Sequence, residues 1–431
     1  MFIPGLTDLL KDIDLYKRKK NQAEFMEAKI SPFRWIVLIL LFLNIFLCVI
    51  AIYSIPPLFS EIGKEIPLTK AQMGTVMGVV VLASIVFAPL GGALSDKIGS
   101  RWALGGSSLI IAAAGAFRTF SYSAIELVIC MFFLGAGLNI LFPNVPKVLG
   151  IWFPSHELAR ANGICMTSVG VGTSIAMATA VGFMSPTLGG WRGVVVSFSA
   201  VSLALGVLWV LFYRDNKKET AVKKKPKNFL INVQHTLNVR DIWIIAIFNL
   251  LNGMSWVAIL SLLPIVLEER GVAKPGELVS VMMLTSVLFN ILSGIASDKA
   301  GRRKPFLVIG AIAHGICIPA FLLFDGVPLV IALVVYGAVL GTLVPIMMII
   351  PVELKSIGPA LTGTAVGVIL MVGNTGSFLG PVVTGKSMDI SGSPWPGFIF
   401  FSIAVFLSAA VGLILRETGR KKSNGPFIGE Y

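Results

Sequence analysis

The chain has 431 residues, of which 55% are hydrophobic and 13% are charged, and its formal net charge is +13. An ordinary soluble domain carries about 25% charged residues, and a chain this apolar could not cover a water-exposed surface with polar groups. The composition therefore excludes a soluble globular protein and indicates a chain whose solvent is the lipid bilayer.

Long uncharged stretches follow one another along the chain. Reading from one Asp, Glu, Lys or Arg to the next gives twelve windows, at 35–60, 71–95, 102–117, 127–146, 161–191, 193–213, 242–267, 278–297, 305–324, 326–352, 356–385 and 390–415. A helix needs about 20 apolar residues to cross the hydrocarbon core, so the short third window must extend past Arg118 toward Tyr122. Strands of a membrane barrel would instead alternate in polarity over roughly ten residues. The sequence predicts an all-α membrane protein with twelve transmembrane helices.

The positive charge is concentrated in one set of loops. With twelve crossings, the termini and the even-numbered loops hold 28 of the 35 Lys and Arg residues, and the odd-numbered loops hold seven. The positive-inside rule therefore places both termini in the cytoplasm. The basic surplus is a topology signal, helped by attraction to anionic lipid. We expect a multi-pass protein of a prokaryotic cytoplasmic membrane, with the lipid bilayer as its partner and no nucleic acid.

A Lys-rich polar segment separates six predicted helices from six. We predict a cytoplasmic N-terminal segment, a six-helix half, a cytoplasmic linker, a second six-helix half and a cytoplasmic tail, at 1–33, 34–213, 214–240, 241–416 and 417–431. The first segment has no apolar core of 7–15 residues and is not predicted to be a cleaved signal peptide. It is either a short helix lying on the inner leaflet, since Leu6, Leu9, Leu10 and Ile13 recur at helical spacing, or an irregular basic lead.

One charged motif occurs twice. The stretch GGALSDKIGSR at 91–101 recurs as SGIASDKAGRR at 293–303, with Asp298 placed 202 positions after Asp96. Each copy follows the second predicted helix of its half. The motif repeats because the half repeats, and internal repeats are typical of secondary transporters.

These two segments resemble the signature loop of the major facilitator superfamily. The matching residues are Gly92, Asp96, Lys97, Gly99 and Arg101 in the first copy and Gly294, Asp298, Gly301, Arg302 and Arg303 in the second. The resemblance covers essentially the whole chain and implies a major facilitator fold. That fold has inverted three-helix repeats, a central cavity lined by the first, fourth, seventh and tenth helices, and alternating access.

The resemblance also implies a role for the motif. Asp96 would contact the start of the eleventh helix and a nearby cation across the two halves, forming a latch that is made in one state and broken in the other. Gly92 and Gly99 would allow close approach and a tight turn. The alternative is that these charges only fix topology.

The end of the fourth predicted helix, LFPNVPKVLGIWFPSHELARANG, resembles the anion:cation symporter branch of this superfamily. In that branch a proline-interrupted helix carries a basic residue five positions before Trp-Phe-Pro, and Lys147 stands at that place, with Asn144 one turn before it. A cation there could attract an anionic substrate. The alternative is that Lys147 reaches the inner interface as a topology anchor. The sequence departs from the branch in that its first helix has no Arg.

Uncharged polar side chains supply the other candidates for a substrate site. Asn249, Asn252 and Trp256 form one stripe of the seventh predicted helix. Single candidates in the first, fourth, tenth and eleventh helices are Asn44, Asn139, Tyr336 and Asn374. Each buried Asn could equally well hydrogen-bond a neighbouring helix.

Other features point away from site chemistry. His314 is expected to be a packed residue on a helix that faces the periphery, and Arg118 is expected to pair with Glu126. The segment 380–387 matches the phosphate-loop pattern G-x-x-x-x-G-K-[ST], which works only between a strand and a helix N-terminus, so we interpret it as helix. With no zinc, nucleophile or cofactor motif, we expect neither an enzyme nor a bound cofactor or metal.

The sequence thus predicts a monomeric secondary active transporter that moves a small organic or inorganic anion by alternating access, as a proton- or cation-coupled symporter. Its partners would be the small-molecule substrate and a coupling ion, most simply the proton. Two alternatives stay open, namely proton-coupled efflux of amphipathic compounds and a non-transporting membrane sensor on the same fold. The spans hold no mid-membrane acid of the kind that proton-driven drug antiporters commonly use, which weighs against efflux.

Overall fold

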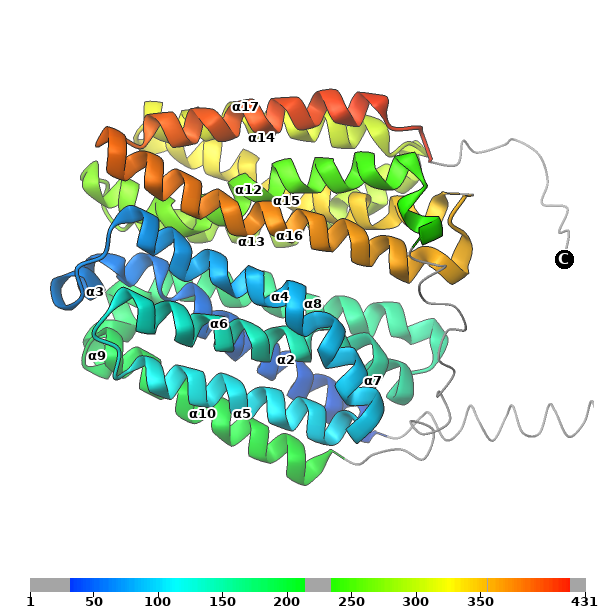
Figure 1. Ribbon diagram of the computed structural model, residues 1–431, viewed down its shortest axis with the longest axis horizontal. Coiled ribbons are helices and arrows are strands. Elements are labelled where there is room, and N and C mark those ends of the chain that lie inside the picture. Colours follow the sequence, from blue (N-terminus) through cyan, green and yellow to red (C-terminus); the bar gives the residue numbers. More distant parts are fainter. Residues whose placement is uncertain (1–31, 214–233, 355, 419–431) are drawn as a thin grey trace, which may run out of the picture.

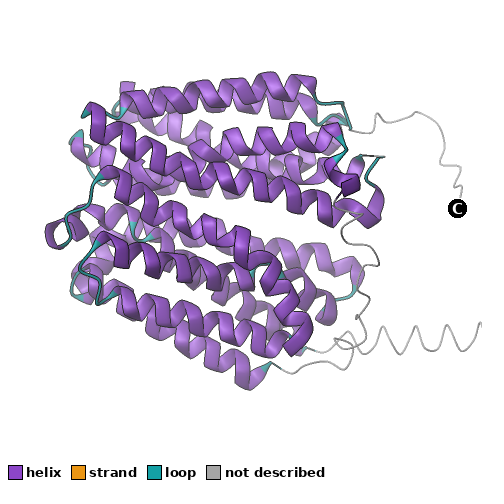
Figure 2. Cartoon of the chain, in the orientation of Figure 1, coloured by secondary structure: helices purple, strands orange, loops and turns teal. Residues whose placement is uncertain are grey.

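The computed structural model describes residues 32–213, 234–354 and 356–418. Within these ranges the chain forms helices and connecting loops, and no strand occurs there (Figure 2). The expected surface helix near the N-terminus, most of the linker and most of the tail lie outside the described residues. The all-α membrane architecture predicted from the sequence is confirmed.

The helices fall into two groups, which lie one below the other in Figure 1. The lower group, here called the first bundle, consists of α2 (Phe33–Tyr53), η1 (Pro56–Leu58), α3 (Phe59–Glu65), α4 (Lys70–Ile98), α5 (Ser100–Arg118), α6 (Ala124–Leu141), α7 (Asn144–Trp152), α8 (Ser155–Thr179), η2 (Ala180–Met184), α9 (Ser185–Leu188) and α10 (Trp191–Phe212). The upper group, the second bundle, consists of α12 (Arg240–Glu269), α13 (Pro275–Ala300), α14 (Lys304–Leu323), α15 (Gly326–Glu353), α16 (Gly358–Ser391) and α17 (Trp395–Ile414).

Eleven helical segments of the described chain are long and apolar enough to cross a membrane. The twelfth crossing is α5, whose 19 residues include several serines and glycines and which packs against α6 and α10. Twelve crossings agree with the prediction. The expected extension of the third helix toward Tyr122 is wrong, because α5 ends at Arg118.

Capping residues fix where the helices begin and end. Thr69 precedes α4 and forms a capping box with Gln72. The Thr69 side chain accepts a hydrogen bond from the backbone N–H of Gln72, and the Gln72 side chain accepts one from the backbone N–H of Thr69. Ser123 and Glu126 do the same for α6. Gly99 stands between α4 and α5 at φ 85, a left-handed conformation that disfavours a side chain. Gly99 therefore makes the tight turn expected of it.

Arg118 is buried at the end of α5, with 1% of its surface exposed. Its Nη1 donates to the carbonyl oxygen of Ala51, 3.1 Å away near the end of α2, where the helix dipole is negative. Glu126 instead accepts the backbone N–H groups of Tyr122 and Ser123 at the start of α6. The predicted Arg118–Glu126 pair is therefore wrong, since each group satisfies a helix end.

The bundles meet along two seams, one between α4 and α16 and the other between α8 and α13. We call the end of the molecule that carries α3, α9 and the start of α4 the closed side, and the end that carries the two repeated motifs the motif side. In Figure 1 the closed side is on the left and the motif side is on the right, where α4 and α16 diverge.

Among the described glycines, those that closely approach the backbone of the other bundle lie toward the closed side. A Cβ added to Gly74 would lie less than 3.0 Å from the Pro381 carbonyl of the other bundle, and one added to Gly385 would meet the Lys70 carbonyl equally closely. Close approach of this kind is what small residues permit between membrane helices.

On the motif side the same four helices leave room around their glycines. An added Cβ would have no neighbouring atom within 4 Å at Gly92, Gly163, Gly294, Gly363 and Gly367. In Figure 1 α4 and α16 diverge toward the motif side, so the bundles are in close contact on the closed side and lie further apart on the motif side. The close approach expected at Gly92 is not made in this state.

Candidate functional site

Polar contacts between the bundles begin at the closed side. The carboxylate of Asp389, at the end of α16, accepts the first two backbone N–H groups of α4, from Lys70 at 2.8 Å and Ala71 at 3.0 Å. A carboxylate is favourable there because the helix N-terminus carries unpaired donors and positive dipole charge. Lys70 also forms an ion pair with Glu269 of α12. The closed side is therefore held by charge-assisted bonds from one bundle to the other.

The hydrogen bond deepest in this seam joins α4 to α16. The Nδ2 of Asn374 donates to Ser84 Oγ at 2.6 Å. Beyond it, toward the motif side, α4 presents Gly92 and α16 presents Gly367 to open space. Asn374, a candidate from the sequence, thus lies at the boundary between the sealed and the separated parts of the seam. Its partner Ser84 was not a candidate, because a serine in an apolar run carries no distinguishing signal.

The three residues of the stripe on α12 differ in their hydrogen-bond partners. Asn249 donates to the Ile369 carbonyl of α16 at 3.2 Å. Trp256 is partly buried, and its buried Nε1 has no hydrogen-bond partner among the described residues. Asn252 donates to Ser408 Oγ of α17 at 2.8 Å and to the carbonyl of Phe248. Only part of the stripe therefore retains polar atoms for a ligand.

His314 lies in the interior of the second bundle, where it is packed as expected. It is fully buried, with Nδ1 3.1 Å from Asn252 Oδ1 and Nε2 2.9 Å from Ser255 Oγ. The ring of Tyr336, another buried candidate, packs edge-on against the imidazole with centroids 4.7 Å apart. This arrangement is that of a satisfied packing histidine, and it occupies the polar groups of Asn252.

The asparagines of the first bundle bond within their own bundle. Asn44 donates to the Leu40 carbonyl and accepts from Ser108. Asn139 donates to the carbonyl one turn earlier in α6. Asn144, fully buried at the break between α6 and α7, donates to the Gly91 carbonyl of α4 at 3.0 Å. Asn144 therefore fixes α7 against α4 next to the first motif.

The first motif copy surrounds the ammonium group of Lys147. Nζ of Lys147 lies 2.8 Å from Asp96 Oδ1 and 2.9 Å from Ser95 Oγ. Arg101 donates from Nε to the Val210 carbonyl of α10 at 2.7 Å, and Lys97 is exposed. In this state Asp96 is paired within the first bundle, and not with a cation of the second bundle as the latch hypothesis requires for its closed state.

The second motif copy forms a denser cluster. Arg303 contacts Asp298 at 2.7 Å and Glu353, at the end of α15, at 2.8 Å, and it donates to Ser297 Oγ at 2.7 Å. The hydrogen bond to Glu353, followed by that to Asp298, raises the pKa of the Arg303 guanidinium. Gly301 ends α13 at φ 59, and Arg302 is exposed. This copy therefore ties together three helices of its own bundle.

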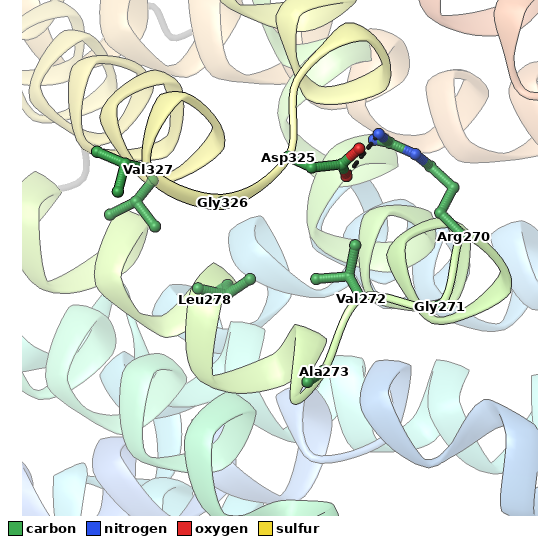
Figure 3. A pocket seen from close by; sticks show the side chains of 9 residues that line it. Arg270, Gly271, Val272, Ala273, Leu278, Asp325, Gly326 and Val327 are labelled. Atoms are coloured by element: carbon green, nitrogen blue, oxygen red, sulfur yellow. Dashed lines mark hydrogen bonds and ion pairs between the residues drawn. The ribbon is translucent and has the colours of Figure 1, made fainter.

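A separate hollow of about 580 Å³ lies on the closed side, between the α12–α13 and α14–α15 loops. Figure 3 shows Arg270 and Asp325 pointing toward each other, and they lie 2.7 Å apart. Val272, Leu278 and Val327 line the same hollow with apolar side chains. Because these two charges satisfy each other, the hollow has little polar chemistry with which to orient a ligand. It contains none of the candidate residues.

Comparison with known proteins defines the class. The family model of the Major Facilitator Superfamily matches residues 41–278 and 245–430, and the chain belongs to this superfamily. A probable sulfoacetate transporter of Cupriavidus necator is 25% identical over 258 residues, which cover 56% of this chain and 60% of the relative. A 4-hydroxybenzoate transporter of Pseudomonas putida is 24% identical over 208 residues, covering 47% of this chain and 45% of the relative. The matched segments thus span 60% or less of the length of these two relatives.

Two solved structures share the fold over most of both chains. The xylose transporter XylE from E. coli, in an inward open conformation, superimposes with a TM-score of 0.72 at 16% identity, covering 89% of this chain and 97% of the other. A bacterial homologue of the human lysosomal transporter Spinster, in an inward-facing and occupied conformation, gives 0.71 at 17% identity with the same coverage. At these identities the likeness is one of fold.

Proposed function

We propose that the protein is a secondary transporter that carries a small organic anion across the cytoplasmic membrane by alternating access. A molecule sealed on one side and separated on the other represents one of the two states that alternating access requires. The positive-inside rule makes the motif side cytoplasmic, so this state would be inward-facing. The two relatives described above are named for sulfoacetate and 4-hydroxybenzoate, which carry a sulfonate or a carboxylate.

The observation that carries the anion class is the position of Lys147. One turn before it, Asn144 bonds to the Gly91 carbonyl, and the next residue of α4, Gly92, faces open space. The Lys147 side chain is 25% exposed. Its ammonium group therefore lies near the motif-side end of α4 and is partly exposed, and we propose that an anion reaches it from the motif side.

Uptake of an anion implies a coupling ion. Moving one negative charge into a cell against a potential of about 100 mV costs roughly 2.3 kcal/mol. Co-transport of a proton or another cation offsets this cost. Symport with a cation is therefore part of the proposal.

The first prediction tests Lys147 in transport. Lys147→Ala should raise the apparent KM about 5- to 150-fold or abolish uptake, because a hydrogen bond to a charged group contributes roughly 1–3 kcal/mol. Lys147→Arg should retain partial function, since it keeps the charge in a different geometry. The measurement is the initial uptake rate of sulfoacetate and 4-hydroxybenzoate into reconstituted vesicles at matched protein density.

A matched control is Lys274→Ala, because Lys274 is 73% exposed on the closed side and pairs only locally with Glu277. The control should transport like the parent. A Lys147→Ala variant within about twofold of the parent would remove the anion-site role. Binding without any flux would favour a sensor, and flux only in the outward direction would favour efflux.

A further inference from the structure

We propose that Asp96 acts as an intramolecular competitor for the substrate anion at Lys147. When the motif side is open, the Asp96 carboxylate pairs with the Lys147 ammonium group and thereby promotes release of the anion to that side. This inference rests on the proposed anion site at Lys147. It gives Asp96 the role of a positioning residue that sets substrate affinity in one state.

Two contacts of Lys147 differ in how exposed the partner is. Ser95 is buried, with 1% of its surface exposed, and its Oγ lies 3.2 Å from Ser100 Oγ. The Asp96 side chain is 73% exposed, although its Oδ1 is only 2.8 Å from Nζ of Lys147. The serine therefore holds the ammonium group in place, while the carboxylate sits on the side that solvent and solutes reach.

The chemistry of Asp96 matches that of the proposed substrate. A carboxylate or sulfonate of the substrate would approach the same ammonium group, and two anions beside one partly exposed cation repel each other. An exposed ion pair contributes little, so a solute can displace Asp96. A tethered group nevertheless acts at an effective concentration in the millimolar range. The competition is therefore close to balanced, which suits a site that must bind and then release.

In the second motif copy the aspartate pairs with a buried arginine, which a substrate anion could not reach in the same way. There Asp298 pairs with Arg303, which is also held by Glu353 and Ser297, and the arginine side chain is only 8% exposed. Arg101, the residue that corresponds to Arg303 by the 202-residue offset, donates instead to the Val210 carbonyl. Asp96 instead pairs with Lys147, which belongs to the fourth crossing and is partly exposed. The difference between the copies assigns the special role to the first.

The test is a calorimetric titration of the purified full chain with sulfoacetate and with 4-hydroxybenzoate. Asp96→Asn should lower the Kd about two- to fivefold, the range expected for loss of an exposed ion pair. In uptake assays the same variant should lower KM and kcat together, because release slows. Asp96→Glu should restore parental values. Asp325→Asn removes a carboxylate of similar exposure, 68%, from an ion pair on the closed side, and should leave the Kd unchanged.

A double variant tests whether Asp96 affects anion binding through Lys147. Lys147→Gln combined with Asp96→Asn should bind as weakly as Lys147→Gln alone, because the competitor acts only through the ammonium group. Tighter binding by the double variant, or an unchanged Kd in Asp96→Asn while Lys147→Gln loses binding, would overturn this inference and leave the anion site standing. If Lys147→Gln binds both anions as the parent does, or if neither anion binds the parent, the anion site itself fails and the competition with it.

Discussion

Side-chain amides inside the membrane serve two purposes in this molecule. Asn374 donates across the two bundles to Ser84, so its bond must break whenever the seam opens there. Asn252 is committed inside one bundle, with its amide group donating to Ser408 and to the Phe248 carbonyl and its oxygen beside His314. In the proposed transporter the first kind of bond would change during the transport cycle, whereas the second kind contributes to the stability of one bundle.

Replacement of Asn252 should therefore reduce stability more than substrate affinity. Asn252→Ala removes two bonds between helices, each worth roughly 0.6–1.7 kcal/mol, and leaves His314 with an unpaired nitrogen. We expect a lower melting temperature with KM within about twofold of the parent. Asn139→Ala is the control, because Asn139 donates only within its own helix, and it should melt close to the parent. A raised KM at an unchanged melting temperature would return Asn252 to the substrate site.

Sequence patterns specify the type and position of these residues but not their partners. The proline-interrupted run before Trp-Phe-Pro indicates Lys147 as a special cation. Its pairing with Asp96, 51 residues away, depends on how α7 packs against α4, which no local pattern encodes. For the same reason periodicity places Asn252 on one stripe of α12 with Asn249 but does not reveal the histidine that occupies it.

At the scale of helices, glycines determine where the bundles can touch. Gly74, Gly276 and Gly385 each place a helix surface against a carbonyl group of the opposite bundle, with no room for a Cβ. These contacts involve four helices, α4 and α16 in one seam and α8 and α13 in the other. The sealed side is therefore specified by missing side chains as much as by the charges of Asp389 and Lys70.

Gly74→Ala should shift the population away from the sealed state. The added methyl would overlap the Pro381 carbonyl, a backbone atom that cannot move aside cheaply. Gly106→Ala is the matched control, because that position of α5 has open space around a Cβ and alanine favours the helix. The measurement is the distance distribution between spin labels at Lys64 and Ile390, both exposed on the closed side. An identical distribution in both variants would show that the α4–α16 contact does not control this side.

Gaps between charges were sufficient to predict the number and approximate ends of the crossings, because hydrocarbon thickness sets helix length and charges avoid the hydrocarbon. They fail at α5. The helix ends at Arg118 because the guanidinium turns inward to the Ala51 carbonyl and does not mark the membrane surface. A buried arginine and an exposed one look alike in sequence.

For the whole molecule, the distribution of charge predicts which side faces the cytoplasm. A single cysteine at Lys64 should react with an impermeant maleimide in intact cells, whereas one at Lys97 should react only after permeabilisation. Both side chains are exposed, at opposite ends of the molecule. The four native cysteines are buried, so background labelling should be low. Labelling of the Lys97 position from outside would reverse the orientation and with it the assignment of this state as inward-facing.

The glycine-lined seam has a consequence for the entropy of the proposed transport cycle. Each flexible side chain that becomes ordered at an interface costs about 0.5–1.5 kcal/mol, whereas a glycine has no rotamers to lose. Where Gly74 meets Pro381 and Gly385 meets Lys70, the surfaces in contact are largely main-chain atoms, which are as ordered when apart as when together. Sealing and parting at these points therefore involve little change in conformational entropy. Two states that differ so little in order can lie close in free energy, and a substrate with only a modest preference for one of them can then shift their populations.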